Sequence, residues 1–125
     1  MIRDHRKLRV FQQADGLALA AYAVTRSMPS EERFGLQAQI RRAAISVAAN
    51  IVEGCARPTT AEYRRFLEIA HASSREIGFL IDIGARLKLL DSARSSQIVK
   101  DYEGLATGLV SLVTSVKRME GRDKA

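Results

Sequence analysis

Apolar residues recur at intervals of three and four along most of the chain, which is the spacing of amphipathic helices. The first such run extends from Val10 to Met28, and Pro29 ends it because the residue before a proline avoids helical geometry. No stretch of the sequence alternates between apolar and polar residues as a half-buried strand does. The pattern predicts four helices, at about residues 9–28, 35–56, 60–89 and 92–120.

The second predicted helix carries more apolar residues than one buried face requires. One stripe comprises Leu36, Ile40, Ala44, Val47 and Ile51, and another comprises Ile45, Ala48, Ala49 and Val52. A helix with so little polar surface must be covered on several sides. We therefore expect its own chain to cover one side and a neighbouring copy to cover another, with Phe34 folded onto the bundle.

Capping residues separate the predicted helices. Ser30 is expected to cap the helical unit that follows Pro29, and Thr59 with Glu62 has the spacing of a capping box at the start of the third helix. Asp91 or Ser92 caps the fourth. Short connections between long amphipathic helices predict an all-α fold, an up-and-down antiparallel four-helix bundle.

Length and composition agree with this architecture. The chain has 125 residues, 46% of them hydrophobic, and fits a single domain over residues 1–125. Gly54, near the end of the second helix, either ends it in a left-handed conformation or lies beside a close neighbour. One cysteine, Cys55, and the absence of any apolar run of membrane-spanning length favour a cytoplasmic protein without membrane contact.

The chain is basic, with a formal net charge of +6 and a pI near 10. Such a balance favours acidic partners, nucleic acid above all. The alternative is that these cations are solvated or paired with nearby glutamates. The candidate contacts to RNA or DNA are Arg3, Arg6, Lys7, Arg9, Arg41, Arg42, Arg57, Arg64 and Arg65.

Catalytic chemistry finds little support. Glu68 and His71 form one Glu-x-x-His pair, but a di-iron bundle site needs two such pairs and two further glutamates. Cys55 has no histidine near it in the sequence to act as its base. No phosphate-binding glycine loop and no Cys-x-x-Cys motif is present. We therefore expect no enzyme, no cofactor and no metal.

A polar stripe on the second helix is the remaining constellation. Its members, Arg42, Ser46, Asn50 and Glu53, are four, four and three residues apart and so share one helical face. They form either a hydrogen-bonded network within or between subunits, with Glu53 balancing Arg42 or another arginine, or the lining of a groove for a ligand or nucleic acid. The network is the interpretation we favour, because buried polar groups can fix the register of packed helices.

Several blocks of sequence together resemble a known bacterial family. They comprise Phe11, Gln12 and Ala14; Pro29 and Glu31–Leu36; Gln39–Ala44, Ser46 and Val47; Asn50, Ile51, Glu53 and Gly54; and Tyr63–Leu67, Ile69, Ala70, Ser73, Ser74 and Glu76. The family is that of four-helix bundle proteins encoded in intervening sequences of 23S ribosomal RNA genes. The resemblance implies a ring-like assembly, typically a homopentamer. A related branch is the accessory protein of diversity-generating retroelements, a basic pentamer that binds reverse transcriptase and nucleic acid.

Two functions follow from these observations. The first is a non-enzymatic oligomeric scaffold whose basic surface binds nucleic acid. The alternative is a protein-interaction module, such as the accessory partner of a reverse transcriptase, without nucleic-acid contacts of its own.

Overall fold

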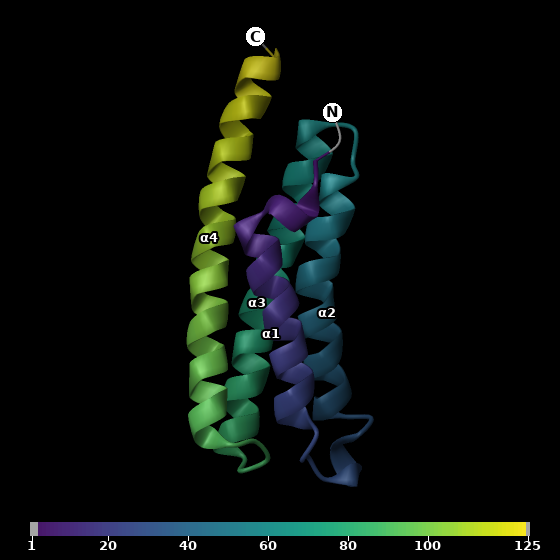
Figure 1. Ribbon diagram of the computed structural model, residues 1–125, viewed down its shortest axis with the longest axis vertical. Coiled ribbons are helices and arrows are strands. Elements are labelled where there is room, and N and C mark those ends of the chain that lie inside the picture. Colours follow the sequence, from purple (N-terminus) through teal and green to yellow (C-terminus); the bar gives the residue numbers. More distant parts are fainter. Residues whose placement is uncertain (1–2, 125) are drawn as a thin grey trace.

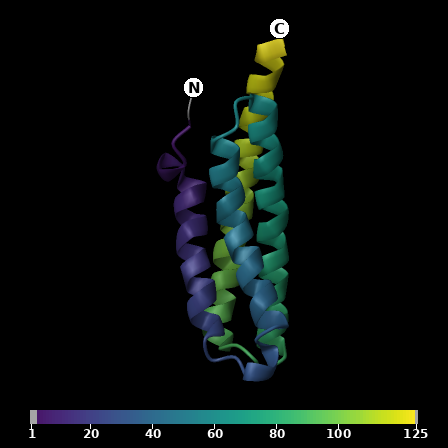
Figure 2. The same cartoon turned by 90° about the vertical axis from the view of Figure 1, so that its right-hand side faces the viewer.

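The computed structural model describes residues 3–124, which form four α-helices and no strand. The α-helices are α1 (Arg9–Thr25), α2 (Leu36–Cys55), α3 (Thr60–Arg86) and α4 (Ser92–Lys124), and two short 3₁₀ helices are η1 (His5–Lys7) and η2 (Ser30–Glu32). Consecutive helices run in opposite directions and lie side by side, so that both ends of the chain are at one end of the bundle (Figures 1 and 2). α3 packs against α2 and α4, and α1 packs against the same two helices.

Two helices end three residues before their predicted ends. α1 ends at Thr25, where the backbone tightens into a turn and the Met28 N–H donates to the Thr25 carbonyl at 3.1 Å. α3 ends at Arg86 because Lys88 adopts a left-handed conformation, with φ of 65°. The Leu89 N–H then donates to the Gly84 carbonyl at 2.9 Å, which satisfies a carbonyl of the last helical turn.

Two of the three predicted caps are confirmed. Thr59 Oγ1 accepts from the Glu62 N–H at 3.1 Å, and Asp91 Oδ2 accepts from the Arg94 N–H at 2.8 Å. The third prediction was wrong. Ser30 begins η2 rather than capping a helix, because the Glu31–Glu32 segment first makes a tighter turn of its own.

The four apolar stripes meet in one core. Fully buried side chains from α2, α3 and α4 include Ile40, Ile51, Ile77, Ile81, Leu105 and Leu109. Burial of each such side chain contributes roughly 1.5–3 kcal/mol relative to exposure, which is why this stripe fixes how each helix is rotated. None of the described helices has the length and apolar character needed to cross a bilayer.

The second apolar stripe of α2 is only partly covered by its own chain. Ile45 is 47% exposed and Ala49 is exposed, whereas Ala48 and Val52 are half-buried. Phe34 was expected to fold onto the bundle, and this was wrong: its side chain is 88% exposed. The turn after η2 directs it outward, away from the core.

Gly54 lies inside α2, which continues to Cys55. No glycine of residues 3–124 has a positive φ, so the left-handed alternative was wrong. A Cβ at this position would lie 2.9 Å from the Cβ of Phe66 and 3.3 Å from the carbonyl oxygen of Tyr63. Gly54 therefore permits the close approach of α2 to α3.

Candidate functional site

The candidate cations lie in two places. Seven of them, from the N-terminal segment, the beginning of α1, the end of α2 and the first turns of α3, lie at the end of the bundle that carries both termini (Figure 1). We call this the basic end; its candidates are Arg3, Arg6, Lys7, Arg9, Arg57, Arg64 and Arg65. Arg41 and Arg42 lie on α2, roughly 20 Å further along the helix axis. The nine residues therefore do not form one continuous face.

The N-terminal segment crosses the basic end and is fixed there by arginines. The Arg3 guanidinium lies 4.1 Å from the ring centroid of Tyr63, and its Nη1 donates to the Arg57 carbonyl at 3.0 Å. Arg6 pairs with Asp4 at 3.0 Å, and this hydrogen bond lowers the pKa of the Asp4 carboxyl. Both arginines thus have structural partners within the chain.

Two further arginines of the basic end are ion-paired. Arg57 pairs with Glu53 one turn before it. Arg64 pairs with Glu68 at 2.6 Å and with Glu120 on α4. The hydrogen bond with Glu120 raises the pKa of Arg64. The pairs of Arg57 with Glu53 and of Arg64 with Glu68 are exposed and therefore weak, whereas the pair of Arg64 with Glu120 is partly buried and holds Arg64 more firmly.

Lys7, Arg9 and Arg65 are the candidates at the basic end whose side chains make no hydrogen bond or ion pair with the described residues. All three are exposed. The predicted contacts did not include the cations of the fourth helix, which reach the same end of the bundle. Figure 1 shows that α4 extends past the other helices at this end, and its last turns carry Lys117, Arg118 and Arg122.

Arg41 joins α1 to α2 instead of facing solvent. Its Nε donates to Thr25 Oγ1 at 3.0 Å and its guanidinium lies 4.6 Å from the ring centroid of Tyr22. Arg42, one residue on, is exposed and makes no hydrogen bond or ion pair in the part of the chain that the structure describes.

The predicted polar stripe is divided by the structure. Asn50 Nδ2 donates to the Ser46 carbonyl at 2.8 Å, and Ser46 Oγ shares a 2.9 Å hydrogen bond with Ser73 Oγ of α3. Arg42 and Glu53 take no part, since Arg42 is exposed and Glu53 pairs with Arg57. What remains is a short polar link between α2 and α3. The predicted stripe did not include Ser73, because this partner lies on a different helix, 27 residues from Ser46.

The outer surface of α2 forms a shallow apolar cavity of about 700 Å³ with the end of α1. Phe34, Ala38 and Ile45 line it, and Arg42 is at its rim. We call Phe34, Ala38, Ile45 and Ala49 the α2 face. This surface exposes an aromatic and an aliphatic side chain, Phe34 at 88% and Ile45 at 47%.

The residues considered for catalysis do not form a reactive centre. Cys55 is buried, and burial raises the pKa of its thiol, which disfavours the nucleophilic thiolate. Burial likewise raises the pKa of neighbouring Tyr63 to about 12. No group of three or more histidine, cysteine or carboxylate side chains suited to a metal occurs in residues 3–124, and Glu68 with His71 borders a shallow cavity beside Lys117.

Comparison with known proteins places the chain in a family. A solved structure from Bacteroides thetaiotaomicron VPI-5482, described as a protein with unknown function from the S23 ribosomal protein family, is similar in fold. Its TM-score is 0.77 at 21% identity, over 84% of this chain and 95% of that one. No curated protein matches the chain. The model of the 23S rRNA-intervening sequence protein family matches residues 6–111, and the protein belongs to that family.

Proposed function

We propose that this protein is a non-enzymatic scaffold that assembles with copies of itself through the α2 face and binds nucleic acid through its basic end. The observation that carries the proposal is the exposed apolar surface at the start of α2, where Phe34 is 88% exposed and Ile45 is about half exposed. Exposed apolar patches rimmed by polar residues are typical of protein–protein contacts.

The composition of the α2 face supports assembly over a small-molecule site. Its cavity is shallow, and arginines surround its aromatic and aliphatic residues: Arg33 lies 5.6 Å from the Phe34 ring and Arg42 is at the rim. Aromatic side chains and arginine are enriched at protein interfaces. The family resemblance adds the expectation that the assembly is a closed ring of five copies.

Light scattering of a paired set of variants tests the assembly. Phe34→Ser with Ile45→Gln removes the apolar anchors, and we expect the assembly to dissociate toward single chains. Leu19→Ser with Val110→Gln is the matched control, because these side chains are also exposed, Val110 at 50%. An unchanged mass for the first variant, or equal dissociation of both, would contradict the role of the α2 face.

Nucleic-acid binding rests on the cations of the basic end. Lys7, Arg9 and Arg65 are exposed and unpaired among the described residues, and α4 brings Lys117 and Arg118 to the same end. Phosphate neutralisation by such residues makes affinity fall steeply with salt. In a ring, each copy would contribute one basic end, and several weak contacts would act together.

The experiment measures RNA and DNA binding by fluorescence anisotropy between 50 and 200 mM salt. The variant Lys7→Gln/Arg9→Gln/Arg65→Gln should bind more weakly at every sequence, and the slope of log K against log salt should decrease by about 2–3. Arg26→Gln/Arg86→Gln/Arg94→Gln removes the same charge at the opposite end, outside the α2 face, and serves as the control. Equal losses in both variants would show that net charge, not the basic end, matters.

The alternative is a protein-interaction module, for example an accessory partner of a reverse transcriptase. A protein partner that remains bound after nuclease treatment, together with no binding of purified RNA or DNA at low salt, would favour this alternative. Self-assembly through the α2 face is compatible with either function.

A further inference from the structure

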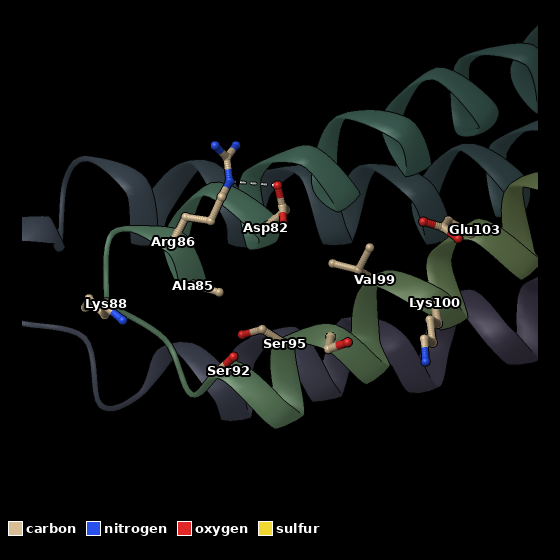
Figure 3. Close-up of a pocket in the computed structure, with 10 residues that line it drawn as sticks. Asp82, Ala85, Arg86, Lys88, Ser92, Ser95, Val99, Lys100 and Glu103 are labelled. Carbon is tan, nitrogen blue, oxygen red and sulfur yellow. Dashed lines mark hydrogen bonds and ion pairs between the residues drawn. The ribbon is translucent and has the colours of Figure 1, made fainter.

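A groove runs between α3 and α4, beginning at the turn that joins them. It consists of two adjoining cavities of about 660 and 340 Å³, which share Asp82, Val99 and Glu103 as lining residues. Figure 3 shows Ser92 and Ser95 of α4 facing Ala85 of α3 across the larger cavity, with Lys88 on the turn. No residue of α2 lines the groove, so it is separate from the α2 face.

Two buried hydroxyl groups in this groove lack a hydrogen-bond partner among the described residues. They are Ser95 Oγ and Tyr102 Oη, and both residues are 1% exposed. The two residues are seven positions apart on α4 and therefore share one helical face; Ser95 lines the larger cavity and Tyr102 the smaller. Buried hydroxyls are almost always hydrogen-bonded, so these two donors along one groove lack an acceptor in the described part of the chain and can donate to a group bound there.

Gly78 opens the smaller cavity beside Tyr102. A Cβ at Gly78 would meet no atom within 4 Å, which means that α3 leaves space here that is not needed for helix packing. A glycine inside an exposed helix lowers stability relative to alanine. Gly78 and the Tyr102 hydroxyl together form a recess that a larger side chain would fill.

The charges around the groove favour an anion. Arg86 is paired with Asp82 at 3.0 Å, whereas Arg75, Lys88 and Lys100 have no ion pair within residues 3–124. Glu103 is the one unpaired carboxylate of the lining. Lys88 is also the non-glycine residue with positive φ, a conformation that glycine would adopt at lower cost.

We propose that this groove binds a small phosphate ester. The phosphate would lie at the turn end, between Lys88 and the serine hydroxyls of α4, and a polar group of the ligand would accept from Tyr102. Lysine provides a mobile positive charge for phosphate, and hydroxyls donate to its oxygens without adding charge. This inference is independent of the scaffold function, because it rests on different helices and on buried hydroxyls rather than exposed cations.

The test is a titration of the full-length, isotope-labelled protein followed by NMR, with ribose 5-phosphate and inorganic pyrophosphate as probes at constant ionic strength. We expect saturable shifts of the amides near Ser95 and Lys88 with both probes, and near Tyr102 with ribose 5-phosphate. A short RNA oligonucleotide in a parallel titration identifies the source of the phosphate: shifts at the same amides would assign the groove to nucleic-acid phosphates. Shifts that do not saturate, or that lie at the basic end for every probe, would overturn the proposal.

Three variants separate binding from folding. Tyr102→Phe should weaken the binding of ribose 5-phosphate at least threefold and leave the affinity for pyrophosphate unchanged. Its urea midpoint should be equal to that of the unmodified protein or higher. Lys88→Gly should weaken both probes severalfold although it relieves the left-handed backbone and raises the urea midpoint. Gly78→Leu on α3 should block the binding of ribose 5-phosphate. Gly104→Leu is the control, because Gly104 has equally open space around it but lies on α4 outside the groove, and it should leave binding unchanged. Unaltered affinity in all three groove variants would refute the site.

Discussion

The approach of α2 to α3 at Gly54 gives a prediction whose sign can be worked out from the structure. An added Cβ would lie 2.9 Å from Phe66 Cβ and 3.3 Å from the Tyr63 carbonyl oxygen, closer than such atoms pack. Both are near or on the backbone and cannot rotate away, so the two helices must separate. Overpacking of this kind costs about 1–3 kcal/mol. The higher helix propensity of alanine offsets roughly 0.8–1 kcal/mol of this cost.

We therefore expect Gly54→Ala to lower the free energy of unfolding by up to about 2 kcal/mol. Gly16→Ala is the control, because the added Cβ would meet no atom within 4 Å. Its free energy of unfolding should rise by up to about 1 kcal/mol through the higher helix propensity of alanine. Urea unfolding followed by circular dichroism measures both, at one protein concentration because assembly contributes to stability. A Gly54→Ala protein as stable as the Gly16→Ala protein would refute the close packing of α2 against α3.

Three further predictions concern local interactions. Thr59→Ala should lower the free energy of unfolding by about 1 kcal/mol through loss of the α3 cap, measured in urea against Thr114→Ala on the exposed side of α4. Ser46→Ala and Ser73→Ala should show a coupling of roughly 0.5–1.5 kcal/mol in a double-mutant cycle, and strict additivity would argue against their hydrogen bond. The pKa of Tyr63 is about 12 in the folded protein and about 10 in the unfolded chain. The stability that the buried neutral phenol contributes is therefore intact below pH 10 and is lost as the pH rises toward 12. Tyr63→Phe should reduce this loss of stability at alkaline pH, measured as the free energy of unfolding against pH.

The fold was readable from the sequence because local signals and the core agree. The first stripe of α2, including Ile40 and Ile51, is buried as its spacing predicts, and the Thr59 and Asp91 caps are in place. The ends of α1 and α3 were misplaced because their apolar spacing continues beyond the last helical hydrogen bond. At Lys88, a left-handed lysine ends the helix where sequence rules look for glycine.

The candidate site was less readable, because partners distant in sequence decide which charges are available. Arg64 pairs with Glu120, 56 residues away, and Arg3 reaches the Arg57 carbonyl across 54 residues. The orientation of Phe34 depends on the turn after η2, which no periodicity encodes. The groove between α3 and α4 depends on the hydroxyls of Ser95 and Tyr102, which resemble ordinary core positions in the sequence.

The exposed α2 face predicts self-assembly, and the mass of the protein in solution tests this directly. One chain has a mass of 13.8 kDa. Multi-angle light scattering should give a mass several times larger, with five chains as the expectation from the family resemblance, and the mass should decrease in Phe34→Ser/Ile45→Gln. A mass of one chain across the micromolar range would contradict the proposal that Phe34 and Ile45 are covered by another copy of the protein.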